Sequence, residues 1–257
     1  MARIFILGAT GSLGGHVLRI ALASGHEVTA FVRDPSRLLA NAGDRITVHR
    51  GDLARSERSE LASLIAGHDA LINCAGNVAD GQQFVELFDR VVTAAESVPA
   101  PDAFVCWFLA GAAMLDIDAS GRRGVDLPKV RATYWPHRAN FERVRRTGLN
   151  WRLLCPGPMV DAPVLGAEKL RLSMDRLPAK VPAFARALPA PFLLPVFASL
   201  IPQMIVAFAD AAAVMLAHLD PGDAVARHRV GLALPEGMRG SKPRWTATTR
   251  QGERPHD

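Results

Sequence analysis

Three glycines, Gly8, Gly11 and Gly14, stand three residues apart directly after the apolar run 4–7. The run is too short for a helix and predicts a buried strand, and residues 12–24 have the apolar spacing of a helix. Where a strand turns through glycines into a helix, free backbone N–H groups can hold a diphosphate at the positive end of the helix dipole. A simple packing turn would also use glycines, but the strands that follow at regular intervals favour binding.

Arg33 is a second residue with binding chemistry, and it ends the next expected strand, 27–32. In a dinucleotide-binding sheet this position faces the adenosine ribose, where a carboxylate binds the hydroxyls and repels a 2′-phosphate. Arginine instead presents a fork of donors that suits a phosphate. The sequence therefore predicts NADP(H) as the preferred cofactor and NAD(H) as the alternative. Asp34 is a candidate to pair with Arg33, and a solvated surface arginine is the plainer interpretation.

The residue types that bind metals show no ligand spacing. The eight histidines are scattered, and Cys74, Cys106 and Cys155 form neither a CxxC pair nor a disulfide framework. We therefore expect no metal site and three buried, reduced thiols, as in a cytoplasmic protein.

Short apolar runs alternate with helical patterns and predict the elements that position these residues. Further strands are expected at 45–49, 69–74, 102–109, 151–155 and 229–234, and helices at 59–65, 82–98, 134–147 and 210–219. This alternation predicts an α/β fold, a Rossmann-type doubly wound parallel sheet with helices on both faces. The break at 110–132 is expected to be a loop at the ligand-binding edge of the sheet.

The composition changes after residue 159. We expect residues 1–159 to form a dinucleotide-binding domain, residues 160–240 a small C-terminal apolar substrate or lid lobe packed on it, and residues 241–257 a polar tail. The stretch 187–209 carries no charge, but its four prolines would kink a spanning helix, so we expect no membrane span.

Bulk properties limit the classes of partner. The chain has 257 residues, of which 49% are apolar, and a net charge of +5. Its basic residues are scattered and not interleaved with aromatics, which argues against nucleic-acid binding and leaves a mild attraction for anionic ligands. We expect no signal peptide, a small-molecule substrate, and a homodimer as one option for assembly.

Several motifs together resemble those of a known family. They are Gly8-Ala-Thr-Gly11-Ser-Leu-Gly14, Phe31-Val-Arg33-Asp-Pro, Gly51-Asp52-Leu53, Ala75-Gly76 and Cys155-Pro-Gly157-Pro-Met. The chain resembles the atypical short-chain dehydrogenase/reductases over roughly residues 2–160, and within them the NAD(P)-binding, NmrA-like and biliverdin/flavin-reductase-like branch.

The resemblance implies roles for the cofactor residues. The pyrophosphate would be cradled by Gly8, Thr10, Gly11, Ser12, Leu13 and Gly14, and the 2′-phosphate would be bound by Arg33. Asp52 and Leu53 would flank adenine. Ala75 and Gly76, followed by Asn77, would lie along the ribose. The nicotinamide would lie near Pro156, Gly157 and Met159.

The family's catalytic pair is altered in this chain. A Tyr-x-x-x-Lys pair usually supplies the proton, but here Arg138 follows Tyr134, and Ala110-Gly111-Ala112 stands where a catalytic serine is usual. We expect Tyr134, His137 and Arg138 as catalytic candidates, with Asn140 on the same helical face as His137. A helix-entry aromatic at Tyr134 and a buried, satisfied histidine at His137 are the plainer interpretations.

These expectations favour an NADPH-dependent oxidoreductase. It would transfer a hydride to a small hydrophobic carbonyl, quinone or flavin-like acceptor, largely by positioning donor and acceptor. A non-catalytic NADP(H)-binding redox sensor of the NmrA-like type is the alternative. An epimerase-like enzyme is disfavoured by the missing Tyr-x-x-x-Lys pair.

Overall fold

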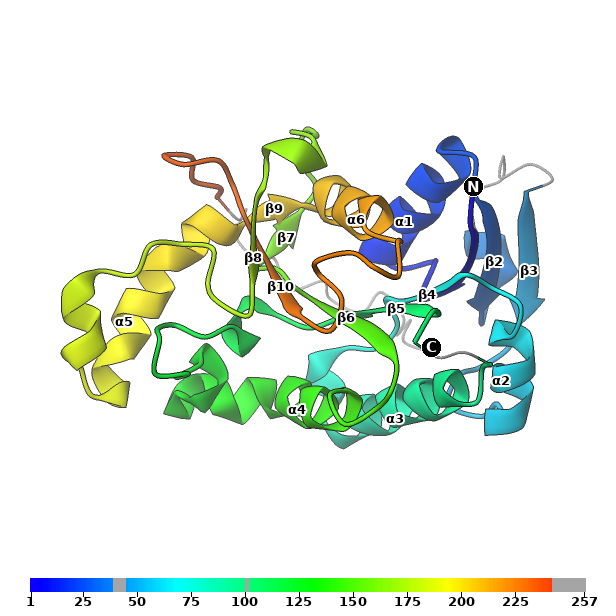
Figure 1. Cartoon of the computed structure of the whole chain (residues 1–257), viewed down its shortest axis with the longest axis horizontal. Coiled ribbons are helices and arrows are strands. Elements are labelled where there is room, and N and C mark those ends of the chain that lie inside the picture. The colour runs from blue at the N-terminus through cyan, green and yellow to red at the C-terminus, as the bar shows by residue number, and fades with distance from the viewer. Residues whose placement is uncertain (39–44, 100–101, 242–257) are drawn as a thin grey trace, which may run out of the picture.

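A computed structural model describes residues 1–38, 45–99 and 102–241. An eight-stranded sheet runs through the molecule, with helices on both faces (Figure 1). The strand order is β3-β2-β1-β4-β5-β6-β10-β8, and the first six strands have the order of a dinucleotide-binding fold. The predicted Rossmann-type α/β fold is therefore confirmed. The strands are β1 (Arg3–Leu7), β2 (Glu27–Val32), β3 (Ile46–Arg50), β4 (Ala70–Asn73), β5 (Val105–Leu109), β6 (Asn150–Cys155), β8 (Arg171–Met174) and β10 (Arg229–Ala233).

Strand β1 shows why the sheet must be covered on both sides. Its side chains alternate, so Ile4 and Ile6 pack into one hydrophobic cluster while Phe5 and Leu7 pack into another. All four side chains are at most 1% exposed. A strand that is apolar on both faces requires helices above and below it.

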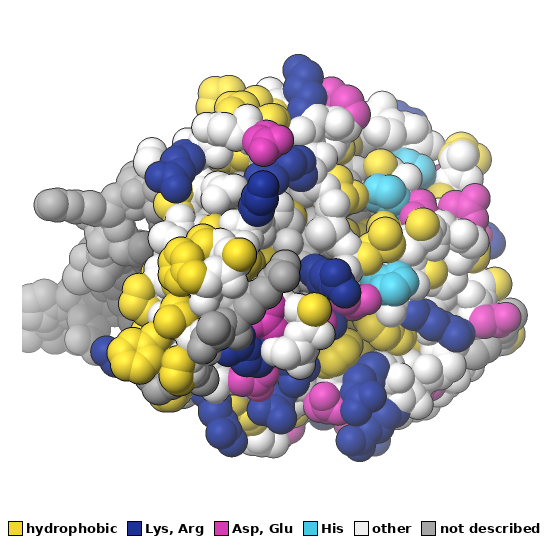
Figure 2. Space-filling model, turned by 60° about the vertical axis from the view of Figure 1, so that its left-hand side comes forward, with side chains coloured by type: hydrophobic (Ala, Val, Ile, Leu, Met, Phe, Trp, Pro, Cys, Tyr) yellow, Lys and Arg dark blue, Asp and Glu magenta, His cyan; other side chains and the backbone are white. Residues whose placement is uncertain are grey.

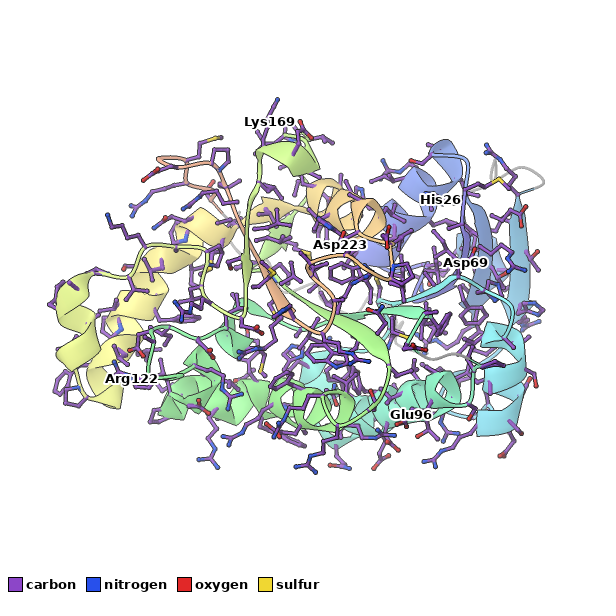
Figure 3. The ribbon with its side chains drawn as sticks, viewed as in Figure 1. His26, Asp69, Glu96, Arg122, Lys169 and Asp223 are labelled. Atoms are coloured by element: carbon purple, nitrogen blue, oxygen red, sulfur yellow. The ribbon has the colours of Figure 1, made fainter. Side chains whose placement is uncertain are left out.

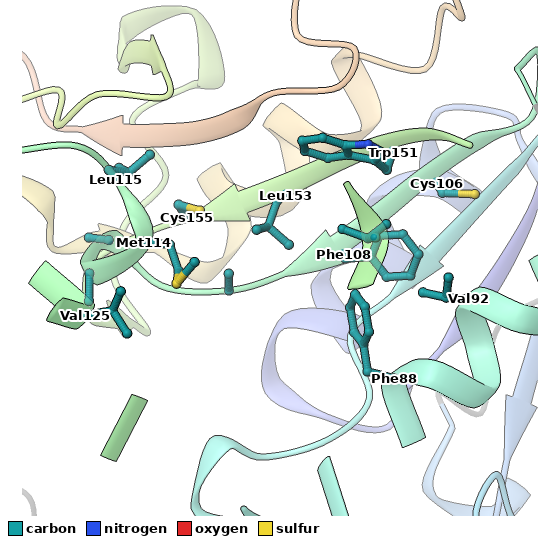
Figure 4. Close-up of a cluster of buried hydrophobic side chains, with 14 of the residues drawn as sticks. Phe88, Val92, Cys106, Phe108, Met114, Leu115, Val125, Trp151, Leu153 and Cys155 are labelled. Atoms are coloured by element: carbon teal, nitrogen blue, oxygen red, sulfur yellow. The ribbon is translucent and has the colours of Figure 1, made fainter. Parts of the chain in front are cut away.

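The helices form two layers. In Figure 1, α1 (Ser12–Ala23) and α6 (Phe208–Ala217) lie side by side on one face, and α2 (Arg58–Ile65), α3 (Gln82–Glu96) and α4 (Pro128–Val144) cover the other. Figure 4 shows the second layer's core, in which Phe88 of α3 meets Phe108 of β5 with ring centroids 4.9 Å apart. This packing fixes α3 and α4 beneath the carboxyl ends of β4 and β5.

The segment expected to form a lobe also contributes to the main sheet. Strand β10 pairs in parallel with β6, and β8 pairs with β10 in antiparallel fashion at the sheet edge. A second, two-stranded sheet joins β7 (Met159–Val160) to β9 (Val206–Ala207). Of the expected tail, only Ser241 lies within the described residues.

Helix α5 (Ala190–Leu200) lies at one end of the molecule, where the sequence showed no clear period (Figure 1). Figure 2 shows yellow hydrophobic side chains gathered on this side, and Phe184 and Phe192 are 65% and 62% exposed. The helix is apolar nearly all round and contains Pro195, so its pattern lacks the polar face that identifies a surface helix. Within the described ranges, no helix is long and apolar enough to cross a membrane.

Helix α4 begins earlier than predicted. It starts at Pro128 rather than Tyr134 and continues through Pro136. Pro128 occupies the first helical position, where its missing N–H costs nothing, whereas Pro136 interrupts one internal hydrogen bond. Tyr134 therefore lies inside the helix, and the interpretation of Tyr134 as a helix-entry aromatic is wrong.

Candidate functional site

The glycine turn between β1 and α1 requires glycine for steric reasons. Gly8 has a φ of +79°, and a Cβ there would lie 2.7 Å from the backbone nitrogen of Ala75. A Cβ on Gly14 would lie 2.1 Å from the carbonyl oxygen of Gly8. The turn thus combines a left-handed bend with a close approach of helix to strand, as a dinucleotide-binding turn does.

The N-terminus of α1 is open to an anion. Gly11 caps the helix, no side chain accepts a hydrogen bond from the cap, and the first turn has no acidic residue. The amides of Ser12 and Leu13 belong to the first helical turn, which has no intrahelical acceptors. Gly11 and Thr10 border a surface cleft, so the positive end of the helix dipole is directed at it.

This cleft has a volume of about 450 Å³ and opens at the carboxyl ends of β1, β2 and β4. Strands β1 and β4 are the neighbours at which the strand order reverses, which is where ligands bind in open α/β sheets. The structure brings most of the predicted cofactor residues to this lining, namely Gly8, Thr10, Gly11, Arg33, Asp52, Leu53, Ala75, Gly76 and Asn77. Ser12 lines an adjoining cavity of about 240 Å³.

The remaining predicted cofactor residues do not line the cleft. Leu13 is buried in the hydrophobic core and Gly14 packs on β1, so they contribute backbone only. Pro156, Gly157 and Met159 follow β6. A Cβ on Gly157 would lie 2.5 Å from the carbonyl oxygen of Met204. Gly157 and Met159 therefore lie against the C-terminal segment, Met159 opposite Val206, whereas the carbonyl oxygen of Pro156 accepts the Ala112 amide.

Two arginines, Arg33 and Arg37, line the cleft, and Asp34 next to Arg33 binds another residue. The Asp34 carboxylate accepts hydrogen bonds from the Ser36 hydroxyl at 2.6 Å and the Ser36 amide at 3.1 Å. These bonds lower the pKa of Asp34, the hydroxyl contributing most. Asp34 thus binds Ser36, and no ion pair with Arg33 forms among the residues that the structure describes. Arg37, which the sequence analysis missed, lines both the cleft and the adjoining cavity.

Two further predicted residues stabilise the turns at the cleft. Asp52 accepts the Ala54 amide at 3.1 Å, and Asn77 accepts the Ala79 amide at 3.0 Å. Each side chain closes its own turn, as Asp and Asn commonly do. The turns bring Leu53 and Gly76 to the lining of the cleft.

The predicted catalytic cation has another partner. Arg138 binds the carboxylate of Asp126, with 3.0 Å between Nη1 and Oδ1. Tyr134 is 37% exposed, and its ring stacks on that of His137 with centroids 6.0 Å apart. No hydrogen bond joins Arg138 to the phenol of Tyr134 within the described ranges, so the expected support of a phenolate by Arg138 is not seen.

His137 and Asn140 lie buried one turn apart on α4, at 7% and 2% exposure. Among the described residues, His137 Nδ1 and both amide atoms of Asn140 have no hydrogen-bond partner. Burial lowers the pKa of His137 to about 4. His137 is therefore neutral near pH 7, and its catalytic role stays a prediction. The plainer interpretation, a buried histidine whose ring nitrogens are hydrogen-bonded to the protein, is wrong for Nδ1 among the described residues.

Gly111 follows β5, in the segment 110–112 where the resemblance implies a serine. A Cβ on Gly111 would lie 4.0 Å from Nε2 of His137, which is an ordinary contact distance. The ring of Phe84 meets that of His137 edge to face, with centroids 5.5 Å apart. On its other side Phe84 packs on Gly76, where a Cβ would lie 2.4 Å from the ring. One aromatic ring thus separates His137 from the cleft residue Gly76.

Of the three cysteines, Cys106 and Cys155 are buried in β5 and β6, whereas Cys74 is half-buried at the cleft. Cys74, Cys106 and Cys155 are free, as predicted, and burial raises the pKa of each thiol, to about 12 for Cys74. In the part of the chain that the structure describes, no three His, Cys, Asp or Glu residues group as a metal site.

Asp210 of α6 is another residue that the sequence analysis missed. Its buried carboxylate accepts hydrogen bonds from the amides of Leu165 and Gly166 at 3.0–3.1 Å. It thereby holds the segment after β7 on α6, and Figure 3 labels Lys169, which lies just beyond this segment.

A larger hollow of about 520 Å³ lies between segments 116–119 and 176–183. It contains none of the predicted site residues. We place the cofactor in the smaller cleft, because the amides of the glycine turn open there and a diphosphate needs such donors.

Comparisons with known proteins identify the family of this chain. The sequence profile of the NAD(P)H-binding family matches residues 8–195. The protein YwnB of Bacillus subtilis is 30% identical over 170 residues, covering 62% of this chain and 73% of YwnB. A proposed pinoresinol-lariciresinol reductase of Arabidopsis thaliana is 28% identical over 106 residues, which cover 38% of this chain and only 33% of that protein.

Solved structures share the fold at low identity. A proposed epimerase of Bacteroides thetaiotaomicron has a TM-score of 0.67 and 20% identity, covering 91% of this chain and 97% of that one. A proposed NADH-flavin reductase of Streptococcus pneumoniae has a TM-score of 0.64 and 19% identity, and the match covers 91% of this chain and 100% of that one. The anaerobilin reductase of Escherichia coli O157:H7 has a TM-score of 0.62 and 17% identity, and the match covers 94% of this chain and 99% of that one.

These structural likenesses show the fold, whereas the profile covers most of the chain and begins at the first glycine of the turn. Together with the glycine turn, the strand order and the cleft at the switch point, it shows that the chain belongs to the NAD(P)H-binding family of the atypical short-chain dehydrogenase/reductases, an oxidoreductase family.

Proposed function

We propose that this protein is an NADPH-dependent oxidoreductase that reduces a small hydrophobic carbonyl, quinone or flavin-like acceptor. The observation that carries the proposal is the pair Arg33 and Arg37 at the cleft, beside an Asp34 carboxylate that is bonded to Ser36. Arg33 and Arg37 both line this cleft, and Arg37 also lines the adjoining cavity at the N-terminus of α1. The two guanidinium groups suit the 2′-phosphate that distinguishes NADPH from NADH.

The rest of the cleft fits the same cofactor. The glycine turn with Thr10 and Ser12 would hold the diphosphate, Asp52 and Leu53 would flank adenine, and Ala75, Gly76 and Asn77 would follow the ribose. Pro156, Gly157 and Met159 would border the nicotinamide side. When bound, NADPH supplies a hydride to the acceptor, and we propose that water supplies the accompanying proton because His137 is neutral and Arg138 is bound to Asp126.

The acceptor class rests on the apolar C-terminal segment. Helix α5 and the exposed Phe184 and Phe192 offer apolar surface at one end of the sheet. Relatives named as flavin, anaerobilin and pinoresinol-lariciresinol reductases support reduction as the reaction class. Cytoplasmic location and a homodimer remain predictions from the sequence.

Cofactor titration tests the proposal. Arg33→Ala and Arg37→Ala should each weaken NADPH binding about 10- to 100-fold, because a charge-assisted hydrogen bond contributes about 1.5–3 kcal/mol. Both should change NADH binding by less than about twofold, since NADH lacks the phosphate. Arg3→Ala is the matched control, because Arg3 is an exposed arginine at the opposite end of β1 that binds Asp69. Equal losses for both cofactors would contradict the phosphate role.

A non-catalytic NADP(H) sensor is the second candidate. It is favoured by Gly111 at the usual serine position and by the engagement of Arg138 with Asp126. Consumption of NADPH in the presence of a panel of quinones, flavins and enones separates the two functions. Tight NADPH binding without any consumption would favour the sensor.

A further inference from the structure

His137 and Asn140 are polar side chains buried without partners beside the carboxyl edge of β5. Burying an amide or imidazole without a hydrogen bond costs free energy, so native structures satisfy such groups with protein, water or ligand. Three unsatisfied atoms on one turn of one helix are therefore a feature that stability alone does not explain. Unsatisfied buried polar groups of this kind occur at binding sites, where the ligand supplies the missing hydrogen-bond partner.

The two side chains share one face of α4. Residues three apart on a helix have Cβ atoms about 5–6 Å apart, so one ligand group can reach both. His137 Nε2 is directed toward Gly111 at the end of β5, and the His137 ring touches Phe84, which covers Gly76 of the cofactor cleft. The Ala112 amide, next to Gly111, donates to the carbonyl oxygen of Pro156, one of the residues that we propose to border the nicotinamide. The pair therefore lies on the side of the site where we propose the nicotinamide.

The donor set specifies the ligand chemistry. Asn140 offers an N–H donor and a C=O acceptor side by side, and both are unpartnered. The group that satisfies both must present an acceptor and a donor side by side, as a primary carboxamide, a lactam or an imide does. A simple ketone or quinone offers only acceptors and would leave Oδ1 of Asn140 unsatisfied.

We propose that Asn140, with His137 beside it, forms a subsite that binds an amide-type edge in the reacting complex. This inference rests on the proposed function, which puts the reaction centre at this end of the cleft. Two molecules carry such an edge: the cofactor, in its nicotinamide carboxamide, and a flavin-like acceptor, in its imide. In either case the subsite would orient the ring that gives or receives the hydride, so Asn140 is a positioning residue.

Asn140→Leu tests the subsite because leucine has nearly the same shape and no polar atoms. The protein offers a matched control in Asn150, which is also buried but whose amide donates to the carbonyl oxygens of Asp102 and Pro221. Thermal unfolding should show that Asn140→Leu keeps or raises the Tm by a few degrees, whereas Asn150→Leu lowers it. A comparable fall in Tm for both variants would show that Asn140 has a structural partner, and would overturn the inference.

Binding then identifies the source of the edge. If Asn140→Leu weakens NADPH about 10- to 100-fold but leaves 2′-phospho-ADP-ribose unchanged, the edge is the nicotinamide carboxamide. The alternative result is unchanged NADPH binding with a KM for flavin mononucleotide that rises about 10- to 100-fold and an unchanged KM for a naphthoquinone. That result would identify the edge as the acceptor's imide. Unchanged binding of NADPH and unchanged KM for both acceptors would overturn the subsite. Failure of the wild-type protein to bind NADPH would instead refute the proposed function.

Discussion

The guanidinium of Arg138 lies 3.0 Å from the carboxylate of Asp126, in the short helical turn that precedes α4. In the related enzymes a cation at this position supports the catalytic tyrosine, but here it joins α4 to the chain before it. Both side chains are about 40% exposed, so the pair contributes little stability, about 0–1 kcal/mol. Its consequence is chemical, because the Arg138 guanidinium is paired with Asp126, and no hydrogen bond joins it to the Tyr134 phenol among the described residues.

Tyr134→Phe should therefore lower turnover by less than about threefold, whereas removal of a positioned general acid costs about 100-fold or more. The measurement is the steady-state rate of NADPH consumption with the best acceptor of the panel. Arg138→Gln should behave similarly and serves as a companion variant. A hundredfold loss in Tyr134→Phe would identify the phenol as the proton donor and would restore Tyr134 to the catalytic role predicted from the sequence.

His137 should make folding stability depend on pH in mildly acidic solution. Its pKa is lowered by burial from 6.5 to about 4, so between these values the unfolded chain binds the proton that the folded chain excludes. The free energy of unfolding is therefore highest above pH 6.5 and falls as the pH is lowered toward 4. The total loss due to His137 is about 3 kcal/mol. Urea unfolding at a series of pH values measures this loss.

His137→Leu is the comparison that isolates the effect, because burial also lowers the pKa of His26 and His68. The variant should lose less stability than the wild type between pH 6.5 and pH 4. Parallel pH profiles for the two proteins would show that His137 is solvated or paired in solution.

Adjacent glycines in α1 give a stringent test of the turn. Gly14→Ala forces a Cβ to 2.1 Å from the carbonyl oxygen of Gly8, so the helix must move, and we expect about 3 kcal/mol of destabilisation with loss of NADPH binding. Gly15→Ala brings its Cβ only to 3.6 Å from the nearest atom, the carbonyl oxygen of Ala9. Because alanine favours the helix, Gly15→Ala should gain up to about 1 kcal/mol and keep binding. Denaturation and fluorescence titration of both variants check the contrast, and similar behaviour of the two would contradict it.

The glycine turn and the parallel sheet could be predicted from the sequence because their causes are local. An apolar run such as 4–7 specifies a strand, and the glycine spacing specifies the turn that follows. Helix α5 could not be predicted in this way, because it is apolar nearly all round and carries an internal proline. Strand β8 is an edge strand of four residues, which is too short for its alternation to stand out.

The chemistry of the site was harder to predict, because it depends on partners far apart in the chain. Arg138 was expected near Tyr134, yet Asp126, which lies 12 positions earlier, binds it. The pKa of His137 depends on its burial, beside Phe84 and Gly111 from two other segments. Arg37 was missed because its position beside the glycine turn depends on the short helix Pro35–Arg37. Spacing predicts which face a residue shares but not which residue from another segment meets it.

Asp210 should be the main attachment of the segment after β7. Its carboxylate is fully buried and accepts the amides of Leu165 and Gly166, so Asp210→Ala leaves two buried N–H groups without an acceptor. We expect a loss of about 2–5 kcal/mol in the free energy of unfolding. The control is Asp161→Ala in the same segment, because the Asp161 side chain is 86% exposed and its removal should cost no more than about 0.5 kcal/mol. Hydrogen exchange should also show faster exchange of the Leu165 and Gly166 amides in Asp210→Ala, whereas wild-type protection of both amides would show that another group holds this segment.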